Sequence, residues 1–167
     1  MLIGGEVLQT ILRYAENAVE GCFVEVGVYQ GDTAAHLAEI AKRQNRQLYL
    51  YDTFTGIPCQ GEYDAHKVGD FSDTSEELVR AKVPSSVICT GLFPETLIPM
   101  PLIAFAHIDC DQYQSVKDCI THLSPLMAKG GVMLFDDYNC LDGATRAVRE
   151  AFKDVQETPQ HKAVVTF

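Results

Sequence analysis

Residues 22–52, CFVEVGVYQGDTAAHLAEIAKRQNRQLYLYD, combine a strand, a glycine-containing turn, a helix and a second strand. Segment 22–26 is short and mostly apolar, as is typical of a buried strand. Gly27 and Gly31 allow a tight turn after it. The helix that follows has apolar residues at helical spacing: Ala34, Leu37, Ile40 and Ala41. Segment 47–51 is again apolar, and two strands joined by a helical crossover run parallel. The stretch therefore predicts a parallel α/β sheet.

The same alternation continues along the chain in both directions. We expect further helices at 7–19, 74–82, 116–123 and 143–152, and further strands at 86–90, 103–108, 131–135 and 163–167. This order predicts one domain over 1–167, with a three-layer, doubly wound, mostly parallel sheet. Its parts are an N-terminal helix within 1–20, a core at 21–152, and a helix end with the last strand at 153–167. Only one strand is expected after the last helix, which predicts a reduced C-terminal edge of the sheet.

Composition excludes several classes of protein. The 167 residues are 47% apolar and 22% charged with a net charge of −10, so binding to nucleic acid or to an anionic membrane is not expected. No apolar run reaches the ~18 to 20 residues of a membrane span. The first residues, MLIGGEVLQT, lack the pattern of a secretion signal. Six cysteines without CxxC spacing indicate reduced thiols, so we expect a cytoplasmic protein.

Two acidic segments, HIDCD (107–111) and FDDY (135–138), each follow a short apolar run that predicts a buried strand. Parallel strands end at the same edge of a sheet, so three or four carboxylates should meet in one crevice. They are Asp109, Asp111, Asp136 and Asp137. Crowded carboxylate oxygens suit Mg²⁺, Mn²⁺ or Ca²⁺. The alternative is that each of them caps a helix or loop. His107 is expected to be a packed, hydrogen-bonded residue of the strand.

The turn after the first strand has the pattern ExGxxxG, from Glu25 through Gly27 to Gly31. It allows the backbone to approach a ligand closely, although a plain glycine-rich turn would look the same. It does not match the GxGxxG fingerprint of dinucleotide-binding proteins. Asp52 ends the second strand about 25 residues after Gly27, where an acidic residue can accept ribose hydroxyls. A cap of a helix or loop is the other reading of Asp52. The polar loop 59–71 is either a lid over the site or a solvated surface loop.

Seven segments of the chain, in this order, resemble class I S-adenosylmethionine-dependent methyltransferases, and more closely the TylF/MycF-type macrocin O-methyltransferase family. They are FVEVGVYQGDTA (23–34), YDTFTGIP (51–58), GDFSDTSEELVRAKV (69–83), TGLFPETL (90–97), HIDCDQYQS (107–115), GGVMLFDDY (130–138) and GATRAVREAF (143–152). Together they cover most of 21–152. The combination is far more specific than any one motif, and it implies a Rossmann-like class I methyltransferase fold.

The resemblance also implies roles for the matching residues. The expected cofactor-binding residues are Glu25, Gly27, Val28, Tyr29, Gly31, Asp52, Thr53, Phe54 and Asp109. The expected metal ligands are Asp109, Asp136 and Asp137, binding Mg²⁺ or alternatively Mn²⁺ or Ca²⁺. Asp111 corresponds to the general base that accepts a proton from the acceptor.

The expected activity is therefore a metal-dependent O-methylation, from S-adenosylmethionine to a hydroxyl of a sugar or similar small molecule. About 20 residues precede the first strand, fewer than in members of the family, so we expect a complete cofactor half and a reduced acceptor half. A homo-oligomer could complete the pocket or cover the edge at 163–167. Two other functions stay open: a non-catalytic module that binds S-adenosylmethionine, and a nicotinamide-dependent oxidoreductase.

Overall fold

The computed structural model describes residues 5–167, which form a seven-stranded sheet in the order β3-β2-β1-β4-β5-β7-β6. The strands are β1 (Cys22–Val26), β2 (Leu48–Asp52), β3 (Val87–Thr90), β4 (Ile103–Ile108), β5 (Met127–Phe135), β6 (Gln156–Glu157) and β7 (Ala163–Thr166). Strands β1 to β5 pair in parallel, whereas β7 runs antiparallel to both β5 and β6. The predicted mostly parallel α/β sheet is confirmed.

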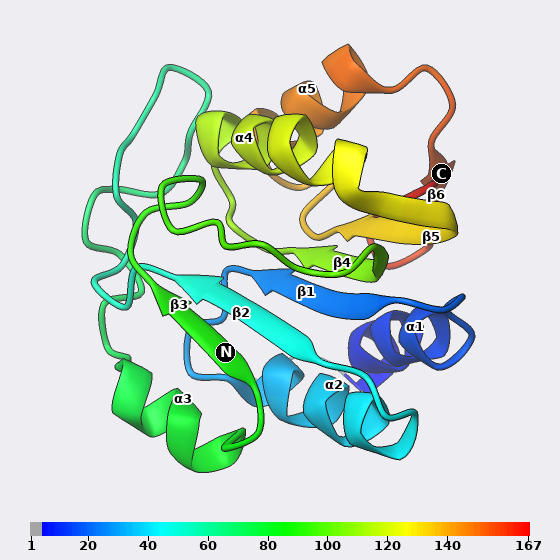
Figure 1. The fold of residues 1–167 in the computed structure, drawn as a ribbon. Coiled ribbons are helices and arrows are strands. Elements are labelled where there is room, and N and C mark those ends of the chain that lie inside the picture. Colours follow the sequence, from blue (N-terminus) through cyan, green and yellow to red (C-terminus); the bar gives the residue numbers. More distant parts are fainter. Residues whose placement is uncertain (1–4) are drawn as a thin grey trace.

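Helices cover both faces of this sheet (Figure 1). The helices are α1 (Gly5–Glu16), α2 (Asp32–Arg43), α3 (Glu76–Lys82), α4 (Tyr113–Leu123) and α5 (Asp142–Ala151), with a short 3₁₀ turn at Ser124–Leu126. Helices α1, α2 and α3 lie on one face, and α4 and α5 on the other. None of the helices formed by residues 5–167 is long and apolar enough to cross a membrane.

Because both faces are covered, the central strands read as continuous apolar runs. All six residues of β4 are buried. In β1, Val24 and Val26 belong to the apolar cluster on the side of α4 and α5, while Phe23 belongs to the cluster beneath α1 and α2. This alternation within a fully buried strand fixes its register, since a slip by one residue would exchange the two faces.

The C-terminal part differs from the prediction. Helix α5 ends at Ala151, before 153, and two strands follow it instead of one. The sequence gives little sign of β6, because it has only two residues, both polar and exposed. As a result β7 lies between β5 and β6 rather than at the edge of the sheet. This pairing removes one reason for the expected homo-oligomer, which stays a prediction. The predicted N-terminal helix is α1, and the rest of that prediction, at 1–4, lies outside the described residues.

The order of the strands locates the functional edge of the sheet. Strand β1 pairs with β2 on one side and with β4 on the other. From β1 the strand order therefore proceeds to β2 and β3 on one side and to β4 and β5 on the other, so it changes direction between β1 and β4. In such sheets, ligands bind beyond the carboxyl ends of the strands at this switch point. The long loop between β2 and α3 extends past these ends (Figure 1).

Candidate active site

A cavity of about 680 Å³ lies at the carboxyl ends of the central strands. Its walls come from the turn after β1, the ends of β2, β4 and β5, the loop after β2, and the residues after β3. A volume of this size is within the ~300 to 1,000 Å³ of small-molecule sites. The cavity therefore has room for a ligand at the place that the strand order indicates.

The turn after β1 packs directly against the end of β4. Gly27 has a φ of 87°, and a Cβ added to it would lie 1.8 Å from the carbonyl oxygen of Asp109. A side chain at this position is therefore excluded by the protein itself. The sequence correctly marked Gly27 as a close approach, but the neighbour in the structure is a strand end. Gly31 is the N-cap of α2 with a φ of 81°, and an added Cβ would lie 3.2 Å from the Val79 side chain.

Asp52 organises the same turn through its carboxylate. Its Oδ2 accepts hydrogen bonds from the backbone N–H groups of Val28 and Tyr29 at 2.7 and 2.8 Å. Its Oδ1 accepts one from the N–H of Phe54 at 2.7 Å. A carboxylate has about four acceptor sites, so most of this capacity is used within the protein. Asp52 lines the cavity, and its predicted contact with ribose stays a prediction.

The remaining predicted cofactor residues take different places. Val28, Tyr29 and Thr53 line the cavity, and their contact with a cofactor stays a prediction. Phe54 does not line the cavity, because its ring packs in the apolar cluster beneath α1 and α2. Its contribution to this region is the backbone N–H that Asp52 accepts. The motif that contains Phe54 does not reveal that its ring points into the core.

The four predicted carboxylates lie together, but in two overlapping groups. Ligand atoms of Asp109, Asp111 and Asp137 lie within 4.8 Å of one another, and so do those of His107, Asp109 and Asp136. Asp109 is common to both groups. The predicted set of Asp109, Asp136 and Asp137 is not one of the two groups found among the described residues, so this ligand set stays a prediction.

Burial and mutual repulsion perturb these carboxyls. Burial, followed by the influence of Asp137 and Glu25, raises the pKa of Asp109 to about 6, although His107 opposes this rise. Burial and the neighbouring Asp109 and Asp137 raise the pKa of Asp111 to about 9. Such crowded carboxyls need either protons or a cation. The donor set of Asp109, Asp111 and Asp137 thus fits a hard divalent cation, which prefers carboxylate oxygens.

The backbone at these carboxylates is also unusual. Asp111 and Asp137 have positive φ values of 61° and 54°. Residues other than glycine rarely adopt this conformation, and it costs of order 1 to 3 kcal/mol. The fold therefore maintains an unfavourable backbone at the two residues that face each other across the ends of β4 and β5.

A buried chain of polar side chains runs beneath the carboxylates. Glu25 Oε1 and His107 Nδ1 are 2.9 Å apart, and both residues are almost fully buried. Burial raises the pKa of Glu25, and the hydrogen bond with His107 opposes this shift. His107 Nε2 lies 3.8 Å from Asp136 Oδ2, and Lys162 Nζ contacts Asp136 Oδ1. His107 is packed and hydrogen-bonded, as predicted.

Lys162 is a residue of the cavity that the sequence did not single out. It lines the cavity and is 5% exposed. In the sequence it stands in the polar segment Gln160-His161-Lys162, where nothing distinguishes it from a surface lysine. Only the pairing of β7 with β5 places it beside Asp136.

The loop after β2 takes part in the cavity wall and is attached at both ends. His66 and Phe71 line the cavity, and their rings contact each other edge to face at 5.0 Å. Asp64 Oδ1 accepts the backbone N–H of Tyr113 at 2.8 Å, at the first residue of α4. At the other end, Tyr29 donates from its hydroxyl to Asp73 at 2.7 Å. Segment 59–71 therefore contributes residues to the cavity wall, and its role as a lid stays a prediction.

Comparisons with known proteins agree with this geometry. The family TylF, described as Macrocin-O-methyltransferase, matches residues 5–164. Demethyldecarbamoylnovobiocin O-methyltransferase of Streptomyces niveus is 29% identical, over 89% of this chain and 66% of the relative. An 8-demethyl-8-(2,3-dimethoxy-alpha-L-rhamnosyl)-tetracenomycin-C 4'-O-methyltransferase of Streptomyces olivaceus is 28% identical, over 88% of this chain and 61% of the relative. The chain therefore spans under two thirds of the length of either relative.

Among solved structures, the O-methyltransferase NovP has the same fold. It superimposes with a TM-score of 0.84 at 23% sequence identity, over 99% of this chain and 81% of that chain. The fold of the described residues is thus that of a solved O-methyltransferase.

Proposed function

The chain belongs to the TylF family of macrocin O-methyltransferases, and on that premise we propose that it transfers a methyl group from S-adenosylmethionine to a hydroxyl group. The observation that carries the proposal is the meeting of four carboxylates with the glycine-containing turn at one cavity. These are Asp109, Asp111, Asp136 and Asp137 at the ends of β4 and β5. A plain α/β domain has no need to concentrate negative charge there.

We propose that the methyl donor lies along the turn after β1. Support comes from the cavity wall, which includes Gly27, Val28 and Tyr29. Asp52 holds this turn through two backbone N–H groups, so the wall is formed before a ligand enters. The methyl group of a sulfonium is already activated, and the main task of the protein is to align it with the acceptor oxygen.

We propose a divalent cation, Mg²⁺ or alternatively Mn²⁺ or Ca²⁺, at the carboxylates. The ligands that the sequence predicts are Asp109, Asp136 and Asp137. In the other possible set, Asp111 takes the place of Asp136. Such a cation lowers the pKa of a bound hydroxyl and orients it. The support is the chemistry of the donors: burial, and after it the neighbouring carboxylates, raises the pKa values of Asp109 and Asp111, and a bound cation would favour their ionised forms.

We propose that Asp111 accepts the proton of the acceptor hydroxyl. Its carboxyl lines the cavity, and a pKa of about 9 keeps it protonated at neutral pH while the site lacks a further positive charge. Added positive charge nearby favours the ionised form, which is the form that accepts a proton. Because a carboxylate has two oxygens, Asp111 can contact a cation with one and take the proton with the other.

The proposed acceptor is a hydroxyl of a sugar or a similar small molecule. The name of the Streptomyces olivaceus relative includes a rhamnosyl group and a 4′-O-methyl transfer, which supports a sugar hydroxyl here. His66 and Phe71, from the loop after β2, provide part of the wall on the open side of the cavity. Their rings suit the apolar face of a sugar ring.

The test is binding followed by turnover. Calorimetry with S-adenosylmethionine and its demethylated product should give affinities on the order of micromolar, about −8 kcal/mol. NAD is the control ligand, and preference for NAD would instead support an oxidoreductase. Labelled methyl donor is then incubated with a panel of sugars and other hydroxylated acceptors, with Mg²⁺ or with chelator. Absence of binding to either form of the donor would rule out the proposal, and turnover on any acceptor would exclude the non-catalytic module.

A further inference from the structure

Lys162 is a buried lysine beside the group of acidic residues at the ends of β4 and β5. It lies in the loop between β6 and β7, directly before Ala163, and only 5% of its surface is exposed. Its Nζ contacts Asp136 Oδ1. A buried ammonium group is costly unless an opposite charge compensates it. The contact with Asp136 therefore compensates the free-energy cost of burying this lysine.

The carboxylate oxygens of Asp136 have further partners inside the protein. Its Oδ1 also accepts the backbone N–H of Asp137 at 2.7 Å. Its Oδ2 lies 3.8 Å from Nε2 of the buried His107, whose other nitrogen contacts Glu25. Asp136 thus has Lys162 and the N–H of Asp137 as direct partners, and His107 Nε2 lies nearby without a hydrogen-bond partner among the described residues.

The other three carboxylates lack the direct ion pair that Lys162 makes with Asp136. Within residues 5–167, no ion pair involves Asp109, Asp111 or Asp137, and their oxygens lie within 4.8 Å of one another. The ammonium of Lys162 also lowers the pKa of Asp109, but within residues 5–167 its ion pair is with Asp136. A cation that approaches Asp136 has to displace Lys162 from Oδ1.

We infer that Lys162 is a positioning residue whose ammonium group pairs with Asp136 and keeps that carboxylate away from a divalent cation. Asp109, Asp111 and Asp137 are then the residues that bind the divalent cation. The part about the divalent cation rests on the proposed function, whereas the pairing of Lys162 with Asp136 does not. The inference selects Asp111 over Asp136 as the third ligand.

The pairing is tested first in chelator, by unfolding Lys162→Met, Asp136→Asn and the double variant. Loss of one partner of a buried pair should raise the unfolding equilibrium constant on the order of 100-fold. The double variant should be no less stable than Lys162→Met, because the neutral amide at position 136 needs no counter-charge. These three variants form a double-mutant cycle. In a second cycle, of Lys162→Met with Asp137→Asn, the two changes in unfolding free energy should add. Additivity in the Asp136 cycle, or equal coupling in both cycles, overturns the inference.

Should Lys162→Met fail to fold, recovery of a folded protein by adding Asp136→Asn supports the pairing. Failure to recover counts against it. Lys162→Arg keeps the charge and should stay within about tenfold of wild type in unfolding constant, since the longer guanidinium still reaches a carboxylate.

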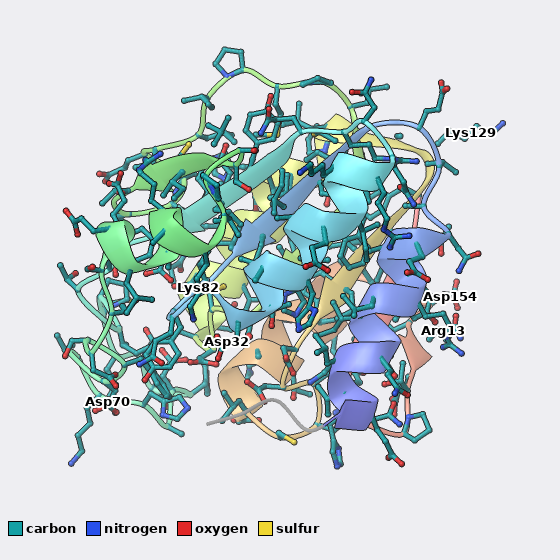
Figure 2. All side chains as sticks on the ribbon, turned by 90° about the horizontal axis from the view of Figure 1, so that it is seen from below. Arg13, Asp32, Asp70, Lys82, Lys129 and Asp154 are labelled. Atoms are coloured by element: carbon teal, nitrogen blue, oxygen red, sulfur yellow. The ribbon has the colours of Figure 1, made fainter. Side chains whose placement is uncertain are left out.

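The second readout is Mn²⁺ affinity, followed by electron paramagnetic resonance. Asp136→Asn should keep the Mn²⁺ dissociation constant within about threefold, whereas Asp137→Asn should weaken it on the order of 100-fold. Lys162→Met should bind Mn²⁺ about tenfold more tightly, because one nearby positive charge is gone. Lys129→Met is the matched control, since Lys129 lies at the periphery (Figure 2) and is exposed.

The two readouts separate the two claims. Equal losses of Mn²⁺ binding in Asp136→Asn and Asp137→Asn overturn the inference and return Asp136 to the ligand set. If wild type binds no Mn²⁺, the metal part of the proposed function fails, and the cycles in chelator alone decide whether Lys162 holds Asp136.

Discussion

Asp111 gives the sharpest prediction, because its carboxyl should make the metal-free protein less stable as the pH rises. Burial and the carboxylates of Asp109 and Asp137 raise its pKa from 3.8 to about 9. The folded protein therefore keeps a proton that the unfolded chain has released. A raised pKa of this kind contributes stability that is complete below the unfolded pKa and is lost as the pH rises through the folded pKa.

The size of the effect follows from the width of this window. Each pH unit between the two pKa values costs about 1.4 kcal/mol for one group. Between pH 6 and pH 8 the contribution of Asp111 should thus fall by at most about 2.7 kcal/mol, because solvent partly reaches the carboxyl. The raised pKa of Asp109, about 6, changes the stability mainly below pH 6.

The perturbation is Asp111→Asn, which removes the titrating group and keeps its shape. Wild type and variant are unfolded with urea at pH 6 and pH 8 in chelator, and the quantity of interest is the difference between their changes in stability. Groups that titrate in both proteins and do not interact with Asp111 cancel in that difference. Asp154→Asn is the control, since Asp154 is exposed and lies at the periphery (Figure 2).

The expected result is a loss of about 2 kcal/mol in wild type that is absent from Asp111→Asn. Mg²⁺ or Mn²⁺ in excess should also abolish the loss in wild type, because a bound cation favours the ionised carboxylates. Equal pH dependence in wild type and Asp111→Asn would refute the reasoning, since it would mean that Asp111 is ionised in the folded protein at neutral pH.

Three further predictions concern the walls of the cavity. Gly27→Ala should cost more than about 4 kcal/mol or prevent folding, because its Cβ would overlap a carbonyl 1.8 Å away. Gly69→Ala has the same sign of φ with nothing within 4 Å, so it should cost about 1 kcal/mol; equal melting of the two variants would contradict the overlap. Asp52→Ala should remove donor binding in calorimetry and cost about 2 to 3 kcal/mol in urea unfolding, because three backbone N–H groups lose their acceptor; unchanged affinity would exclude this role. Asp64→Ala should cost about 1 kcal/mol and speed proteolysis of the loop after β2, since Tyr113 N–H loses its cap; an unchanged cleavage rate would show that the loop is held elsewhere.

Much of the fold was predictable because its signals are local. The apolar runs that become β1, β2, β4 and β5 are visible in the sequence, and so are the helical spacings between them. The exception is β6, since two exposed polar residues have no apolar pattern. Such a strand forms only because β7 presents it with unpaired backbone groups.

The candidate site was predictable to the level of its strand ends. The sequence placed Asp109, Asp111, Asp136 and Asp137 at one edge, and the structure brings them together there. It did not predict that Phe54 would turn its ring into the core. Side-chain direction after a strand depends on the turn that follows, and here the φ of Phe54 is 52°.

The sequence by itself determined the order of strands and helices, the glycine-containing turn and the acidic strand ends, since these depend on neighbours within a few residues. Only the tertiary structure decided which carboxylate acts with which partner. Lys162 reaches Asp136 across 26 positions of the chain, and His107 reaches Glu25 across 82. The burial that raises the pKa values of Asp109 and Asp111 likewise exists only when the strands are assembled. Charges in water interact weakly, and the same charges enclosed at the end of a packed sheet determine what the site can bind.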